Sequence, residues 1–137
     1  MISGLTIILL VIGAGILHHY SLIVLRRISV RVLPDTALRP ITVFVGLAAL
    51  HMIEIAIFAA LLAFTTGEAA VAVTGSGFSG SVSDWLYLAG LLFTTLAFDL
   101  EGEIRLIAAT GSLVGFMLLT WSATFLFAEC QKVWNKE

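Results

Sequence analysis

The sequence predicts an all-α integral membrane protein with three transmembrane helices and one short re-entrant helix between the second and the third. Hydrophobic residues occupy 60% of the 137 positions and charged residues only 12%, about half the charged fraction of an average soluble domain. The apolar residues are gathered into long runs, and the mean hydropathy is +1.09. We therefore expect the lipid bilayer to surround the chain, and we expect no nucleic-acid partner.

The first apolar run, Ile2–Leu25, is long enough to cross the hydrocarbon core, because about 20 helical residues suffice. No basic segment precedes it, and it is longer than the apolar stretch of a cleaved signal peptide. Four arginines follow and share a segment with Pro34 and Pro40, and we place them in a connection rather than along a helix: Arg26, Arg27, Arg31 and Arg39. Residues 1–40 are thus predicted to be a transmembrane helix with a basic cytoplasmic connection.

The second run, Ile41–Phe64, begins the second predicted region, residues 41–137. Pro40 suits the first turn of its helix, where a missing N–H is harmless. The Gly/Ser-rich connection from Thr65 to Ser83 then precedes an apolar stretch, Asp84–Phe93, of only about ten residues, too short to span. Such a helix is re-entrant, interfacial or buried in protein, and Ser81 or Ser83 is its expected N-cap.

The last run, Ile104–Ala128, is again long enough to cross. It contains Gly111 and Gly115, a spacing that permits either close helix packing or a gating hinge. Both alternatives remain open at this point.

The distribution of charge predicts the orientation. Six of the seven basic residues lie in the first connection or near the C-terminus, whereas the segment from Thr65 to Glu103 has acidic residues and no basic one. Because lysine and arginine near membrane ends favour the cytoplasmic side, we expect the N-terminus outside and the C-terminus in the cytoplasm.

A short helix that descends into the membrane points its partly negative C-terminal end inward, which favours a cation. Irregular backbone at that depth persists only where protein buries it or where it lines a water-filled path. The stretch after the short helix, FTTLAFDLEGEIR (Phe93–Arg105), would be such backbone.

This stretch resembles the TTVGYGD-type filter of pore-loop potassium channels. The similarity includes small bacterial two-transmembrane-pore ion channel proteins with an extra N-terminal helix. Three segments carry the resemblance: LHMIEIAIFAALLAF (Leu50–Phe64), DWLYLAGLLFTTLAF (Asp84–Phe98) and IRLIAATGSLVGFMLLTWSATFLFAECQKVW (Ile104–Trp134). It implies that residues 41–137 are a pore domain, and that four copies surround a central pore in a bacterial inner (plasma) membrane. It implies no cofactor other than permeant K⁺, Na⁺ or Ca²⁺.

The resemblance also assigns a selectivity filter, which comprises Thr94, Thr95, Leu96, Ala97, Phe98 and Asp99. Ala97 replaces a glycine of the family, and Asp99 either replaces the second glycine or follows a one-residue deletion. Four copies of Asp99, with Glu101, would place a ring of carboxylates at the outer mouth, and acidic rings favour cations. Oxygen-rich sites suit hard ions such as calcium. We therefore expect a weakly potassium-selective cation channel that passes sodium or calcium.

His18, His19, His51 and Glu54 are ionisable residues within the apolar runs. His51 and Glu54 share a helix face, and the helical rise puts both pairs at depths where contact between helices is feasible. They form either a metal, haem or proton site or an interhelical hydrogen-bonded cluster. The sequence favours the second, because a metal or haem site needs more ligands at one depth.

Three classes of function remain. The cation channel is the leading one, with a potassium-selective channel as its variant. The others are a membrane metal or redox protein built on the histidines and a non-conducting membrane subunit, which Ala97 keeps open. An enzyme is not expected, because no nucleophile–base set, phosphate-binding loop or enzymatic metal-ligand spacing is present in the sequence.

Overall fold

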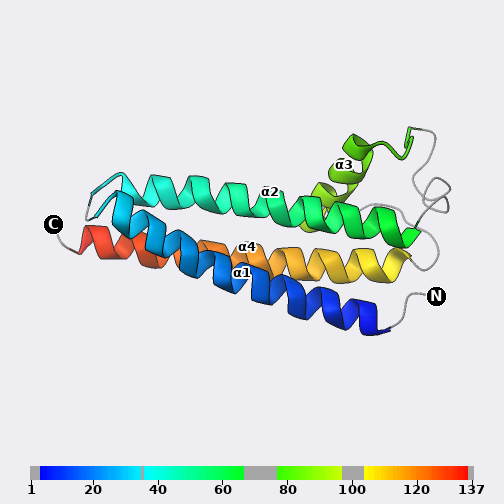
Figure 1. Ribbon diagram of the computed structural model, residues 1–137, viewed down its shortest axis with the longest axis horizontal. Helices are drawn as coiled ribbons and strands as arrows, with labels where there is room; N and C mark the ends of the chain where they lie inside the picture. The colour runs from blue at the N-terminus through cyan, green and yellow to red at the C-terminus, as the bar shows by residue number, and fades with distance from the viewer. Residues whose placement is uncertain (1–3, 35, 67–76, 97–103, 136–137) are drawn as a thin grey trace.

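The computed structural model describes residues 4–34, 36–66, 77–96 and 104–135, and these residues form four α-helices. Three are long: α1 (Gly4–Val32), α2 (Arg39–Thr66) and α4 (Ile104–Trp134). They run lengthwise through the molecule, and the short α3 (Val82–Phe93) lies at the end opposite the C-terminus (Figure 1). Each long helix is long and apolar enough to cross a membrane. The prediction of an all-α chain with three such helices is therefore confirmed.

The sequence predicted that four arginines lie in a connection between helices. This prediction was wrong, because all four lie on helices. Arg26, Arg27 and Arg31 lie on α1, which continues to Val32. The helix ends there because Pro34 disfavours helical geometry at the residue before it. Only Arg39 lies beyond this turn, where it begins α2.

The C-terminal end of α4 is also longer than the sequence predicted. The apolar run ends at Ala128, but the helix continues to Trp134. The added turn contains Glu129, Gln131 and Lys132, which are good helix formers and need no apolar surroundings to stay helical. Hydropathy alone therefore placed the end of this helix too early.

The N-terminus of α3 is capped as the sequence predicted, with Ser81 as the N-cap. The Ser81 hydroxyl accepts from the Asp84 N–H at 3.2 Å, and the Asp84 carboxylate accepts from the Ser81 N–H at 3.2 Å. The same carboxylate accepts from the hydroxyl and the N–H of Ser79 at 2.6 and 2.9 Å. These hydrogen bonds lower the pKa of Asp84 to about 2. A charged cap of this kind fixes where α3 begins.

The helices pack around two main groups of buried side chains. Around α3, Leu88 and Leu92 pack against Leu62 of α2 and Ile107 of α4. Toward the C-terminal end, Leu22 of α1 packs against α2 residues. Among the described residues the backbone of α3 lies close to α2 and α4 but not to α1. The short helix is therefore held between two of the long helices, in one half of their length.

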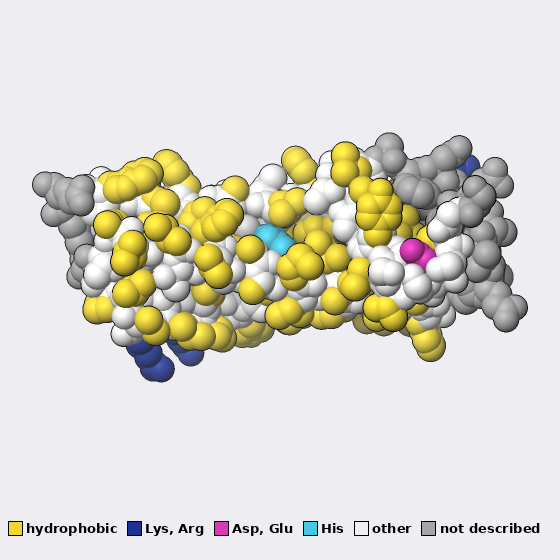
Figure 2. Space-filling model, turned by 90° about the horizontal axis from the view of Figure 1, so that it is seen from above, with side chains coloured by type: hydrophobic (Ala, Val, Ile, Leu, Met, Phe, Trp, Pro, Cys, Tyr) yellow, Lys and Arg dark blue, Asp and Glu magenta, His cyan; other side chains and the backbone are white. Residues whose placement is uncertain are grey.

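The surface suits a lipid environment. Large hydrophobic side chains are exposed along all three long helices, among them Leu9, Phe44 and Phe116. Figure 2 shows one such face, covered by hydrophobic side chains along most of its length, with Lys and Arg side chains at the end that bears the C-terminus. Such a distribution indicates membrane insertion, because a soluble surface rarely exposes so much apolar area.

Candidate functional site

The predicted filter is only partly within the described residues. Thr94, Thr95 and Leu96 follow α3 directly and are exposed in the single chain. Ala97, Phe98, Asp99 and Glu101 lie outside the described residues, as does Glu103. The structure therefore defines where the candidate filter begins and leaves its acidic part a prediction.

The end of α3 lies against the middle parts of α2 and α4. The Phe93 ring is 5.7 Å from the His51 ring, centroid to centroid. A Cβ added to Gly115 would lie 2.9 Å from the Phe93 Cα and closer still to its carbonyl oxygen. Gly115 is therefore the point at which α4 allows the backbone of α3 to approach.

The backbone turns sharply where α3 ends. Thr94 donates its N–H and its hydroxyl to the Gly90 carbonyl at 3.1 and 2.9 Å. Thr95 has a φ of 63°, which is rare for a β-branched residue and costs free energy. Leu96 donates its N–H to the Leu91 carbonyl at 2.9 Å. The chain is thus held in a strained turn at the first residues of the candidate filter.

Three of the four residues predicted to form a polar cluster come together, and with Ser122 they connect three helices: His18, His51 and Glu54. Glu54 of α2 is 5% exposed and accepts two hydrogen bonds. One comes from Nδ1 of His18 on α1, and the other comes from Nδ1 of His51 one turn earlier on α2, each at 2.8 Å. Nε2 of His18 lies 3.3 Å from the Ser122 hydroxyl of α4. The interhelical hydrogen-bonded arrangement that the sequence favoured is therefore what the side chains adopt.

The structure does not bring His19 into this cluster. His18 is fully buried, whereas His19 is exposed. The His19 ring contacts Tyr20 and Trp121, at centroid distances of 5.5 and 5.8 Å. Because adjacent helical residues point about 100° apart, only one of the two histidines can face α2.

Aromatic rings and an apolar cavity surround the cluster. The His18 ring lies 5.7 Å from the His51 ring and 5.5 Å from the Trp121 ring. A cavity of about 410 Å³ borders Glu54 and is lined by side chains of the four helices, with Glu54 as the charged residue among them. The cavity runs past Phe58 and Phe93 and reaches Thr6 near the start of α1. The carboxylate thus faces open apolar space on one side and two imidazoles on the other.

Gly111 faces α2, while Gly115 faces the end of α3. A Cβ at Gly111 would overlap the ring of Phe58, which is 5% exposed. Both glycines lie within the continuous helix α4. Their contacts are those of a packing notch, and a role as a hinge stays a prediction.

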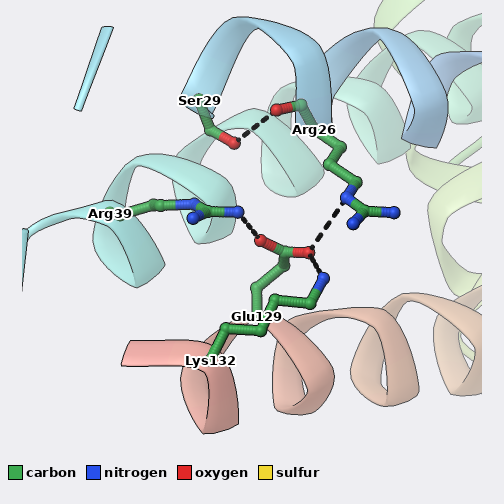
Figure 3. Close-up of polar contacts among 5 residues, drawn as sticks. All are labelled: Arg26, Ser29, Arg39, Glu129 and Lys132. Carbon is green, nitrogen blue, oxygen red and sulfur yellow. Dashed lines mark hydrogen bonds and ion pairs between the residues drawn. The ribbon is translucent and has the colours of Figure 1, made fainter. Parts of the chain in front are cut away.

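A second polar group, which the sequence interpretation missed, lies at the end of the molecule that bears the C-terminus. Glu129 of α4 is 1% exposed and forms ion pairs with Arg39 of α2 and Lys132 of its own helix (Figure 3). Nε of Arg26 on α1 lies 3.6 Å from the same carboxylate. The Ser29 hydroxyl donates to the Arg26 carbonyl at 3.0 Å. The signal in the sequence was Glu129 at the end of the last apolar run, because that end was predicted to lie on the same side of the membrane as the arginines.

These contacts tie the C-terminal ends of α1 and α4 to the N-terminal end of α2. Arg39 is 5% exposed, and its Nε is buried without a hydrogen-bond partner among the described residues. A buried carboxylate with several cationic partners can remain ionised in apolar surroundings. We call Arg26, Arg39, Glu129 and Lys132 the Glu129 network.

Comparison of the chain with protein-family models, with curated proteins and with solved structures gives no match. The function must therefore be inferred from the geometry of the chain itself.

Proposed function

We propose that the chain is the subunit of a homotetrameric cation channel. In this proposal α3 is a pore helix, and the segment from Thr94 to Asp99 forms the filter. α2 and α4 are then the outer and inner helices of the pore, and α1 packs on the outside. The resemblance to pore-loop potassium channels and the packing of α3 between α2 and α4 both support this arrangement.

One observation carries the proposal: α3 ends beside the middle of α2 and α4, and the exposed backbone that follows it is not helical. Gly115, next to Phe93, is the twelfth residue of α4. At about 1.5 Å per residue it lies roughly 16 Å from the start of that helix, near the middle of a hydrocarbon core. The residues Thr94–Leu96 are exposed at this level in the single chain.

The N–H groups of Thr94, Thr95 and Leu96 have partners within the turn. Carbonyl groups at that depth cannot face lipid, because lipid offers them no hydrogen-bond donor. This segment must therefore face other protein or a water-filled path. Further copies of the chain around a central axis satisfy both needs, because they bury the exposed residues and enclose a path between them. The partly negative end of α3 would then point at a cation in that path.

The acidic residues after Phe98 set the expected selectivity. Asp99 and Glu101 would form rings of carboxylates at the outer mouth, and Ala97 stands where the resembled filter has glycine. Carboxylate rings attract cations without the size match of a carbonyl filter. The proposed channel is therefore weakly potassium-selective and passes sodium or calcium.

The test is a bi-ionic reversal potential in planar bilayers, with potassium on one side and sodium or calcium on the other. The wild type should show a non-selective or calcium-favouring potential. Asp99→Asn should shift it, and Glu103→Gln is the matched control because it removes one acid from the same stretch. Native mass spectrometry of the purified protein should show assemblies of four chains.

Each outcome decides a different part of the proposal. A potassium-selective potential that ignores Asp99→Asn would favour the potassium-selective variant and remove the acidic ring from the conduction path. Equal shifts for Asp99→Asn and Glu103→Gln would mean that surface charge alone matters. Absence of current from a protein that is tetrameric and folded would refute the channel function.

A further inference from the structure

We propose that His18, His51 and Glu54 form a binding site for a divalent transition-metal ion of the zinc class. One ligand atom of each residue lies within 4.8 Å of the others. Imidazole nitrogens and a carboxylate oxygen are ligands that zinc takes in proteins, and sites with three protein ligands keep a fourth position open. The site does not depend on the channel function, so either proposal can fail alone.

The distances need only a small adjustment to accept an ion. Nδ1 of His18 and Nδ1 of His51 each lie 2.8 Å from an oxygen of Glu54. With bonds of about 2.0–2.1 Å, tetrahedral zinc separates its ligand atoms by roughly 3.3 Å. Each nitrogen–oxygen distance would therefore lengthen by about half an ångström, and the two nitrogens, which lie at most 4.8 Å apart, would take the same spacing.

The charge of the cluster also favours a cation. A carboxylate in an apolar interior is costly without a positive partner, and the described contacts of Glu54 include no lysine or arginine. A metal ion binds the lone pair of an imidazole nitrogen, so in the metal-bound form each ring is neutral and carries its proton on Nε2. The ion then supplies the positive charge beside Glu54.

Ser122 provides the outer contact that a metal-binding histidine usually has. Once Nδ1 of His18 binds the ion, its Nε2–H can donate to the Ser122 hydroxyl, which lies 3.3 Å away. Such a contact fixes the orientation of the imidazole and strengthens metal binding. The bound ion would then join α1 to α2 directly and orient against α4 through Ser122.

The cavity beside Glu54 leaves room for the fourth ligand. Its volume of about 410 Å³ borders the carboxylate and far exceeds the space that one water occupies. A water bound to the ion would have the metal and the Glu54 carboxylate as polar partners.

The experiment measures zinc bound per chain. The protein would carry Cys130→Ser to remove its thiol, which is the free cysteine of the chain, and its affinity tag would be cleaved off. After a chelator has removed any metal, the protein in detergent micelles is equilibrated with micromolar free zinc. Its zinc content is then measured by inductively coupled plasma mass spectrometry. One zinc per chain is expected, and cobalt should give the visible absorption of a tetrahedral site.

The adjacent histidines offer a matched control. His18→Asn should abolish binding, whereas His19→Asn should leave it unchanged, because His19 is exposed and outside the cluster. Ser122→Ala keeps all three ligands and should weaken binding by about 10–100-fold. This milder variant keeps the test valid if His18→Asn fails to fold, which the elution profile in micelles would reveal.

Two results would overturn the proposal. The first is a folded wild type that takes up no zinc and gives no cobalt absorption. The second is equal loss of zinc in His18→Asn and His19→Asn, since that would place the ion elsewhere. A zinc-binding protein without conductance would leave this site established and the channel function refuted.

Discussion

Glu129 is the acidic residue that pairs with the basic side chains at the end of the molecule bearing the C-terminus. It is 1% exposed and pairs with Arg39, which is itself almost fully buried. Removal of one partner from a buried ion pair leaves the other charge uncompensated, and this costs more than the pair contributes as a whole. The same principle makes an exposed partner such as Lys132, whose side chain is 41% exposed, far less important.

We therefore predict that Glu129→Ala lowers the free energy of unfolding by about 3–5 kcal/mol. Lys132→Met, which removes the ion-pair partner of Glu129 on the same helix, should cost at most about 1 kcal/mol. Unfolding in mixed micelles with increasing SDS, followed by tryptophan fluorescence, measures both. Equal costs for the two variants would show that the burial of Arg39 does not matter.

Single residues also show how far sequence reasoning could go. The spacing of His51 and Glu54 puts both on one helix face, and the structure has them hydrogen-bonded at 2.8 Å. The sequence did not distinguish His18 from His19, because the rotation of α1 is set by packing that includes the buried Leu22. No local pattern links Ser122 to His18, and only tertiary packing brings the two side chains together.

At the scale of elements, hydropathy predicted which segments are helices better than where they end. The structure has a helix at each of the three apolar runs and at the short stretch between them. The long helices have the apolar surface, and the short helix has the cap, that the sequence contains. The ends of α1 and α4 extend past these runs into charged residues. Ion pairs between helices stabilise those ends. A local sequence pattern cannot predict such a pair, because Arg39 and Glu129 are 90 positions apart.

The contact between α3 and α4 depends on the absence of a side chain at Gly115. An added Cβ would collide with the carbonyl oxygen and Cα of Phe93, and a backbone cannot rotate away as a side chain can. Gly115→Ala should therefore destabilise the protein by about 1–3 kcal/mol, the usual cost of overpacking. The end of α3 would have to move away from α4.

Gly15→Ala is the control for this prediction, because a Cβ at Gly15 meets nothing within 4 Å. Alanine favours a helix over glycine by up to about 1 kcal/mol, so this variant should be neutral or slightly stabilised. The same SDS unfolding series measures both variants. If Gly115→Ala proved as stable as Gly15→Ala, the close approach of α3 to α4 would be refuted.

For the molecule as a whole, the two ends differ in charge. The end with the C-terminus bears Arg26, Arg27, Arg31, Arg39 and Lys132 on described helices. The opposite end has Asp84, with its pKa lowered to about 2, and Arg105. Because Asp84 stays ionised in any physiological solution, this asymmetry persists across that whole pH range.

The asymmetry predicts that the C-terminus is cytoplasmic, since clustered Lys and Arg residues resist translocation. In a bacterial host, green fluorescent protein fused after Glu137 should fluoresce, and alkaline phosphatase at the same position should be inactive. Arg27 and Arg31 are exposed and lie outside the Glu129 network. Their joint replacement by glutamine should therefore raise the phosphatase signal without unfolding the helix ends.

The stability of that variant separates two roles of the basic residues. If insertion depends on charge count, the change at Arg27 and Arg31 alters orientation while SDS unfolding stays as in the wild type. If the Glu129 network instead fixes the topology by holding the helix ends together, Glu129→Ala would change the fusion signals and the arginine variant would not. An active phosphatase on the wild-type chain would show that the orientation is the reverse of the predicted one. The acidic residues after Phe98 would then face the cytoplasm.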